Sequence, residues 1–149
     1  IATNGELPPD QLFGAAHLDS AEAADRWVAL DQTAHRAEHA HTQNVVCCSL
    51  NFPSSLPWRE LNRWLTAFRI KHGERLLRVK GIVELEGETA PVALHGVHHV
   101  FHPPLPLPHL RGKGLHGARL VVIARDLSED EIKASWRAFT DERAALPSE

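Results

Sequence analysis

Several residue types are scarce in this sequence, and each scarcity narrows what the protein can be. There is no methionine, and the only two cysteines, Cys47 and Cys48, are adjacent. Adjacent cysteines rarely pair with each other, so no disulfide framework is visible and a reducing cytoplasm is the expected compartment. Because the first residue is Ile1 rather than methionine, we expect the sequence to be a piece of a longer protein.

Basic excess and long apolar runs are also missing. The net charge is −3 and the pI is about 6.4, whereas a nucleic-acid-binding domain would show a basic stripe. The longest apolar runs, such as "RLVVIA", are strand-sized and far too short to span a membrane. The first residues have neither the basic start nor the apolar core of a signal peptide. We therefore expect neither a nucleic acid nor a membrane as a partner.

What is present is enough apolar material for a folded core, at 43% of the residues. Strand-like patterns cover residues 43–52, 75–87, 91–101 and 119–125, and helix-like patterns cover residues 56–73 and 127–146. In the first helix Leu61, Trp64, Leu65 and Phe68 share one face. In the second, Ser128 and Glu131 form a capping box ahead of a buried stripe. That stripe consists of Ile132, Trp136 and Phe139.

The order of these elements is β-α-β-β-loop-β-α, which predicts an α+β fold. We expect a mainly antiparallel four-stranded sheet with both helices on one face, preceded by a helical or irregular linker. The linker is assigned to residues 1–41, where residues 20–40 can form a helix, and the folded domain to residues 42–149. The stretch 102–118 should be an extended, mobile loop, because its prolines exclude both a helix and a ladder strand.

The predicted strand over residues 75–87 has two different faces. One is apolar and includes Leu77, Val79 and Val83, while the other carries the cations Arg78 and Lys80. Such alternation predicts a strand that is buried on one side only. A cationic face is most often solvated or ion-paired. The other interpretation is a docking surface for an acidic region of a neighbouring domain.

Histidine is abundant, with 11 residues, and three of them lie in the stretch "HRAEHAHTQ". On a helix, His35 and His39 lie one turn apart on the same face, so both imidazoles could bind one ion. His41 lies about 200° around the helix from His39 and could join them only if the helix ends first. The stretch is either a weak, exposed site for Zn, Co or Ni, or a solvated linker.

A second group consists of His95, His98, His99 and His102. In one continuous strand, His95 and His99 share one face and His98 and His102 share the other, with about 13 Å between the members of each pair. A single strand therefore cannot bring either pair onto one ion. A bulge near Gly96, or further ligands such as His109 or His116, would be needed.

Catalytic motifs are missing. The stretch "LRGKGLH" contains Gly-Lys, but Gly114 stands where a phosphate-binding loop requires Ser or Thr. A histidine-based metal hydrolase needs three metal ligands and a nearby carboxylate base, and no H-E-x-x-H or equivalent spacing occurs. We therefore expect that this chain alone is not an enzyme.

Three stretches together resemble the C-terminal domain of the CobW family of P-loop GTPases. They are "LNRWLTAFRIKHGERLLRVKGIVELEG", "VALHGVHHVF" and "RLVVIARDLSEDEIKASWRAF". The "G…LLRxKG" pattern of that family corresponds to residues 73–81, its second strand to residues 94–97, and its late strand to residues 120–127. The resemblance covers roughly residues 43–140. His95 stands where the family often has Gln, and the proline-rich loop replaces an aromatic residue before the late strand.

The resemblance implies a parent protein that uses GTP to handle a transition metal, with cobalt for cobalamin synthesis or zinc for zinc homeostasis. This chain would then be its accessory regulatory or interaction domain, with residues 1–41 as the tail that leaves the GTPase domain. GTP and Mg would bind only in that domain, and so would the metal held by the family's cysteine motif. Partners would be the GTPase domain, a metalloprotein client or a second copy of the chain. The alternative is a stand-alone, histidine-rich metal-binding module.

Overall fold

The computed structural model describes residues 44–144 together with Ala23 and Arg26. The other residues of the predicted helix over 20–40, and the boundary predicted at residue 42, lie outside these described residues. The domain contains strands β1 (Val45–Phe52), β2 (Leu76–Val83), β3 (Val92–Val97), β4 (Val100–Phe101), β5 (Leu105–Pro106) and β6 (Ala118–Arg125). Its helices are α3 (Trp58–His72) and α4 (Glu129–Ala144), with short 3₁₀ turns at Gly73–Arg75 and Pro108–Leu110.

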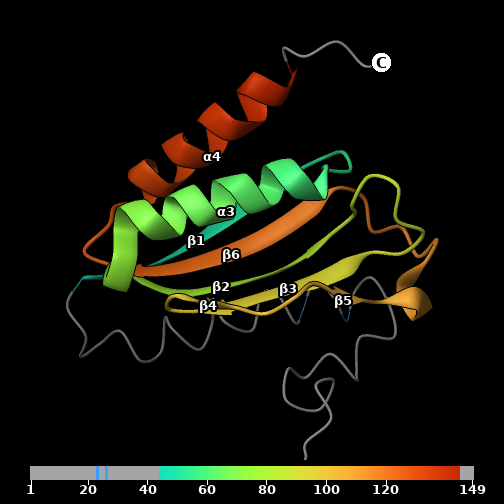
Figure 1. Cartoon of the computed structure of the whole chain (residues 1–149), viewed down its shortest axis with the longest axis horizontal. Coiled ribbons are helices and arrows are strands. Elements are labelled where there is room, and N and C mark those ends of the chain that lie inside the picture. Colours follow the sequence, from blue (N-terminus) through green and yellow to red (C-terminus); the bar gives the residue numbers. More distant parts are fainter. Residues whose placement is uncertain (1–22, 24–25, 27–43, 145–149) are drawn as a thin grey trace, which may run out of the picture.

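The strands form one six-stranded antiparallel sheet in the order β1-β6-β2-β3-β4, with β5 also pairing with β3. Both helices lie on the same side of this sheet (Figure 1). The predicted α+β class, antiparallel pairing and one-sided helices are therefore confirmed. The strand count differs, because the two-residue strands β4 and β5 add to the four long strands that the sequence predicted.

Local sequence signals determine where α3 ends and where α4 begins. α3 stops at Gly73, whose φ of 51° is a left-handed conformation that glycine adopts without a steric penalty. α4 begins with the predicted capping box. The Ser128 backbone N–H donates to the Glu131 carboxylate at 2.8 Å, and the Glu131 N–H donates to the Ser128 hydroxyl at 3.1 Å. These reciprocal bonds satisfy two N–H groups that the helix itself leaves unpaired.

The main core lies between the helices and the sheet. The predicted stripes of both helices are buried there, against side chains from β1, β2, β3 and β6. Trp64 and Trp136 meet edge to face with ring centroids 4.8 Å apart, and each packs near Phe139. Their indole N–H groups donate to Ser135 Oγ at 3.1 Å and to the Asn51 carbonyl at 3.0 Å. The aromatic cluster therefore ties α3, α4 and β1 together.

A second, smaller core covers part of the face of the sheet opposite α3 and α4, which we call the helix-free face because neither of these two helices lies on it. Leu107, Leu110 and Leu115 come from the proline-rich stretch and belong to one buried cluster with Ile82 and Val121 of the sheet. The expectation of an extended, mobile loop is therefore wrong over this part. The apolar residues that alternate with its prolines bury themselves instead, and β5 adds a short ladder to β3.

The prediction that β2 is buried on one side only is also wrong. Val79, Lys80, Ile82 and Val83 are all buried, since both faces of the central strand are covered. A register shift between Leu76 and Arg78 marks a bulge in the pairing with β6. As a result Leu76 joins the helix-side core and Leu77 packs against the second cluster, so Leu77 does not share a face with Val79.

Candidate functional site

The two predicted sites fall in different parts of the chain. His35, His39 and His41 lie outside the described residues, so their arrangement stays a prediction. Arg78 and Lys80 lie on β2 on the helix-free side of the sheet, in register with Val97 and His95 of β3. Arg78 is partly buried, and Lys80 is only 5% exposed. Any docking surface here must therefore depend mainly on Arg78 and its neighbours.

The neighbours of Arg78 are apolar and accessible. Val97 pairs with Arg78 on one side and with Val100 of β4 on the other, so the three residues form one row across the sheet. We call these three residues the valine row. Val97 is 40% exposed and Val100 is 49% exposed. Cross-strand partners in an antiparallel sheet point to the same face. The row therefore offers two exposed valines next to one cation.

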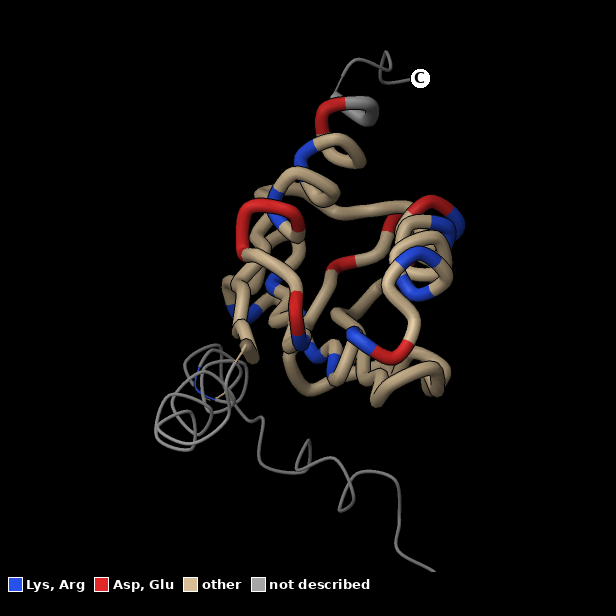
Figure 2. Tube along the Cα trace, turned by 90° about the vertical axis from the view of Figure 1, so that its left-hand side faces the viewer, with Lys and Arg blue, Asp and Glu red and all other residues tan. Residues whose placement is uncertain are grey.

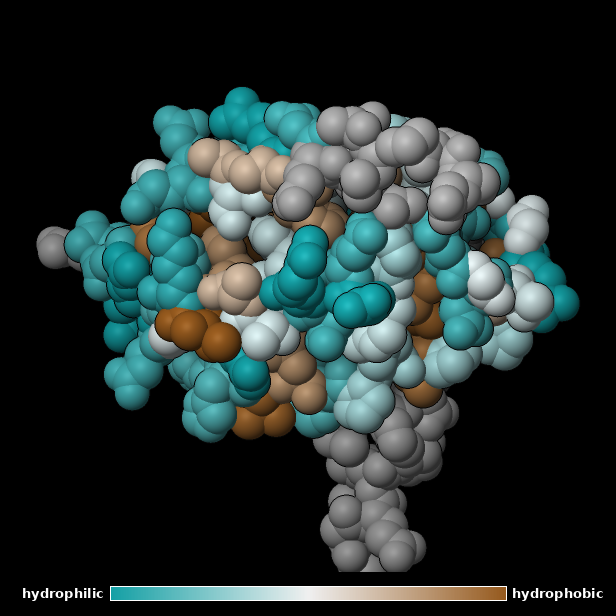
Figure 3. All heavy atoms as spheres, turned by 45° about the horizontal axis from the view of Figure 1, so that its top comes forward, coloured by the Kyte–Doolittle hydropathy of each residue, from teal (hydrophilic) through white to brown (hydrophobic). Residues whose placement is uncertain are grey.

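The helix side of the domain has a different surface. Figure 3 shows a mainly hydrophilic face with scattered apolar side chains. Ile70 of α3 is 75% exposed, but the other large exposed apolar side chain of this helix, Trp58, lies at the opposite end of α3. Lys and Arg residues alternate with Asp and Glu along the chain rather than separating into two poles (Figure 2). Isolated apolar residues and mixed charges are ordinary for a solvated surface.

The histidines of the second group lie on a hairpin that the sequence analysis missed. The predicted strand over 91–101 turns back at His98 and His99, and β3 pairs with β4 through Val97–Val100 and Gly96–Phe101. His98 has a φ of 51°, a left-handed conformation that is uncommon for residues other than glycine. The prediction of one continuous strand is therefore wrong. The sequence signal that could have predicted this turn is the pattern "VHHV", in which two polar residues separate two β-branched ones.

The reversal brings His95 and His102 together. The His102 N–H donates to the His95 carbonyl at 3.0 Å, which continues the ladder beyond β4. The two imidazole rings lie nearly parallel, with an interplanar angle of 17° and centroids 5.6 Å apart. The hairpin turn is tied to α3 by Arg69, whose Nη1 donates to the His99 carbonyl at 2.9 Å. Residues that a flat strand would separate are thus neighbours.

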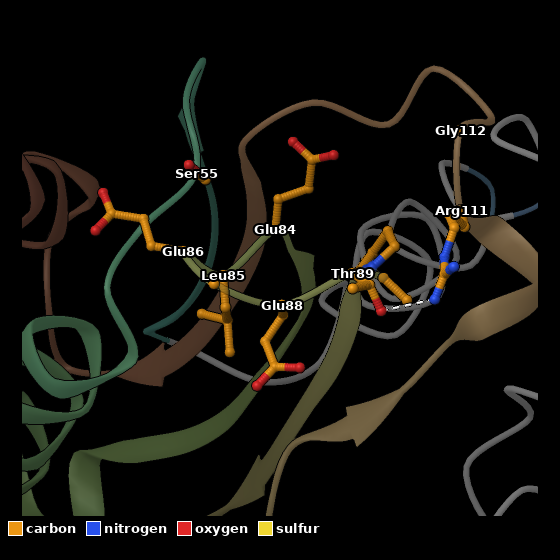
Figure 4. Close-up of a pocket in the computed structure, with 11 residues that line it drawn as sticks. Ser55, Glu84, Leu85, Glu86, Glu88, Thr89, Arg111 and Gly112 are labelled. Carbon is orange, nitrogen blue, oxygen red and sulfur yellow. Dashed lines mark hydrogen bonds between the residues drawn. The ribbon is translucent and has the colours of Figure 1, made fainter.

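A pocket of about 290 Å³ lies beside the turn between β2 and β3. Glu84, Glu86 and Glu88 contribute to its lining, but Figure 4 shows their side chains pointing in different directions. Glu84 accepts a hydrogen bond from the Gly117 N–H at 2.9 Å, and Arg111 donates to the Thr89 hydroxyl at 2.6 Å. The carboxylates are therefore not arranged around a common point.

Other features of the described residues bear on metals and membranes. Within residues 44–144, Ala23 and Arg26, no group of three or more His, Cys, Asp or Glu residues is placed to hold a metal ion. In the same part of the chain, no helix combines the length and the apolar character needed to cross a bilayer. Cys47 and Cys48 lie on opposite faces of β1, as the strand periodicity predicted.

Comparisons with known proteins agree with the motifs. The profile of the cobalamin synthesis protein cobW C-terminal domain matches residues 45–140. No curated protein matches the chain. Two solved structures are similar, the Zn(II)-bound YjiA GTPase from E. coli and a Zn(II)-bound triple mutant of YjiA GTPase. For both, the TM-score is 0.54 and the sequence identity is 20%, over 64% of this chain.

At 20% identity, these two structures show a shared fold and nothing more. The match covers 30% of the length of the YjiA chain, so this chain corresponds to only part of that protein. The family profile is more decisive, because it extends from the first residue of β1 into α4 and so includes every strand of the sheet. The chain belongs to the family of CobW C-terminal domains.

Proposed function

We propose that this chain is the accessory, non-catalytic domain of a CobW-type GTPase that handles a transition metal, either cobalt for cobalamin synthesis or zinc for zinc homeostasis. The observation that carries the proposal is the family match over residues 45–140, which is a match to a C-terminal domain. The similar fold in a Zn(II)-bound GTPase, of which this chain spans 30%, supports it. The only two cysteines are adjacent and so rarely pair with each other, which also favours a reducing compartment such as the cytoplasm.

In this proposal the valine row, with Lys80 beside it, is the surface that docks on the GTPase domain. Val97 and Val100 supply the apolar centre, and Arg78 supplies a charge that an acidic partner would complement. Interfaces of this kind combine an apolar centre with a polar rim. A metalloprotein client or a second copy of the chain would be further partners of the same surface.

The experiment is to mix the chain with the separately purified GTP-binding domain of its parent protein. We expect a complex in calorimetry, a changed rate of GTP hydrolysis by the partner, and no hydrolysis by this chain alone. Val97→Asp with Val100→Asp should weaken the complex about tenfold or more, because a buried interface centre tolerates charge poorly. Both valines are exposed in the free chain, so the double variant should fold.

Ile70→Asp is the matched control, since Ile70 is also an exposed apolar residue but lies on α3 at the opposite side of the sheet. It should leave the complex unchanged. Equal weakening by Ile70→Asp and by the valine variants would show that docking does not use the valine row. Hydrolysis of GTP by this chain alone would contradict the non-catalytic assignment.

The second candidate function is a stand-alone metal-binding module. The density of histidine before β1 favours it, with His35, His39 and His41 as the proposed ligands of Zn or Co. Calorimetry with Zn²⁺ and Co²⁺ should show weaker binding for His35→Ala with His39→Ala than for the unmodified chain. Unchanged affinity would remove this site and leave the stretch as a solvated linker.

A further inference from the structure

The hairpin formed by β3 and β4 places two imidazoles side by side at the edge of the sheet. His95 precedes Gly96 on β3, and His102 follows Phe101 on β4, so the two residues are the next cross-strand pair after Gly96–Phe101. Side chains of such a pair share one face of the sheet. His95 is partly buried and His102 is exposed. One ring is therefore held by its surroundings and the other can reach solvent.

The spacing of the rings suits one metal ion between them. Zinc binds imidazole nitrogen at about 2.0–2.1 Å, so two imidazoles on one tetrahedral ion have centroids roughly 5–6 Å apart. The observed separation of the His95 and His102 ring centroids is 5.6 Å. Because the two rings lie nearly parallel, side-chain rotation would be needed to direct one nitrogen of each ring at a shared ion.

The backbone of the hairpin is held in place by packing. A Cβ atom at Gly96 would approach the Phe101 ring to 2.7 Å, which shows that Phe101 lies directly over this glycine. The hydrogen bond from Arg69 to the His99 carbonyl fixes the turn against α3. A metal site whose ligands stand on a fixed ladder loses little conformational freedom on binding.

The charges around the pair determine which side the ion would occupy. Lys80 is in register with His95 on β2, so the row across the sheet runs from Lys80 through His95 to His102. A cation next to His95 opposes a second cation. The ion would therefore lie between the two rings, on the His102 side of His95 and away from Lys80.

We propose that His95 and His102 form a two-imidazole site for a transition-metal ion of the Zn²⁺, Ni²⁺ or Cu²⁺ class, which prefers nitrogen ligands of this kind. Two protein ligands leave the remaining coordination positions to water or to a donor group from a second molecule. The site is separate from the histidines before β1. It also does not depend on the proposed docking to a GTPase domain, because both ligands belong to this chain.

The test uses the 149-residue chain carrying His35→Gln, His39→Gln and His41→Gln, so that the first histidine group does not contribute. Zn²⁺ is added while the imidazole signals are followed by NMR and the affinity is measured by calorimetry. We expect the His95 and His102 signals to shift together before those of other histidines. His102→Gln should weaken binding at least about tenfold, because even the loss of an outer-shell partner costs 10- to 100-fold.

The matched control is His109→Gln with His116→Gln, which removes two exposed histidines elsewhere in the loop and should leave the affinity unchanged. His102 is exposed, so its replacement should not disturb the fold, and His95→Gln serves as the second variant. Equal affinity with and without His102 would overturn the proposal. So would Zn²⁺-induced shifts spread evenly over all the histidine signals.

Discussion

The two faces of the sheet are covered in different ways. On one face, α3 and α4 bring long apolar and aromatic side chains from regular elements of 15 and 16 residues. On the other, three leucines of an irregular, proline-rich stretch cover part of the strands. The helix-covered face has the properties of a stability-determining core. The helix-free face combines a smaller core with Lys80, paired histidines and exposed valines, and it is where we place the proposed sites.

The difference teaches that a polar residue on a strand indicates a functional surface only when the layer that covers its face of the sheet is known. Lys80 and Cys48 both lie in central positions of their strands and are both buried. Cys48 faces the helices and is an apolar-like core residue, whereas Lys80 faces the helix-free side beside His95. Packing alone explains the burial of Cys48. Lys80 is instead a basic side chain that the fold keeps on the face with the proposed docking and metal sites.

The largest expected effect comes from breaking the aromatic cluster on the helix-covered face. Trp64→Ala removes a ring that contacts Trp136, Phe68 and Phe139, so we expect a loss of about 3 to 5 kcal/mol in the free energy of unfolding. Urea denaturation monitored by circular dichroism measures it. Trp64→Phe, which keeps an aromatic ring, should cost less. A loss below about 1 kcal/mol would show that the helix layer is not the principal core.

Leu110→Ala tests the core of the helix-free face. Leu110 is 0% exposed, and we expect a loss of about 2 to 3 kcal/mol, at the lower end for buried leucines, because an irregular segment can partly close the cavity. Leu105→Ala, at a partly exposed position of β5, should cost less. A loss equal to that of Trp64→Ala would remove the distinction between the two faces.

The reactivities of the adjacent cysteines allow the solvent accessibility of the two faces to be compared directly. Burial raises the pKa of the Cys48 thiol from 9.0 to about 11, and the nearby Glu129 carboxylate adds to the rise. This lowers the thiolate fraction at neutral pH about 100-fold relative to an ordinary thiol. Iodoacetamide should therefore modify the partly exposed Cys47 well before Cys48, as mass spectrometry of Cys47→Ser and Cys48→Ser would measure. Equal rates would mean that the helix-covered face opens readily.

The smallest effect concerns His72, at the end of α3 on the helix-covered face. Its ring is 6% exposed and packs on Phe68, and its Nδ1 has no hydrogen-bond partner among the described residues. Burial lowers the pKa of His72 below its ordinary value of 6.5, and Lys71 and Arg75 lower it further, while Glu131 opposes them. The unfolded chain therefore binds a proton more readily than the folded chain does.

Stability from His72 is thus fully present above about pH 6.5 and is lost as the pH falls toward its folded-state pKa. Urea denaturation between pH 7.5 and 5 measures the decline. His72→Gln, which has no proton to bind in this range, should reduce the pH dependence. An unchanged pH profile in this variant would assign the dependence to other groups.

Much of the helix-covered face could be predicted from the sequence, because its signals are local. Ser128 and Glu131 are three residues apart, and their reciprocal bonds need only the first turn of a helix. The apolar stripes of α3 and α4 follow the helical period and are buried as expected. The family motif also has a physical explanation in this fold. A Cβ atom at Gly81 would lie 2.2 Å from the Arg119 carbonyl oxygen, so this position requires glycine.

The helix-free face could not be predicted, because its arrangement depends on contacts that are distant in sequence. The hairpin turn has histidine at a left-handed position, whereas two-residue turns usually carry Asn, Asp or Gly. The leucines between the prolines follow no helix or strand period, and their burial depends on the strands beneath them. The bulge near Leu76 shifts which residues face each core, and no local pattern marks it.

The sequence by itself determined the α+β class, the start of α4, the helical residues of the main core and the family, because each of these depends on periodicity, capping chemistry or ordered motifs within short segments. Only the tertiary structure decided that His95 and His102 are neighbours, that Lys80 is buried and that Val97 and Val100 stand exposed beside Arg78. The physical reason is that burial and cross-strand proximity are properties of strand order and register, which arise only when separated segments pair.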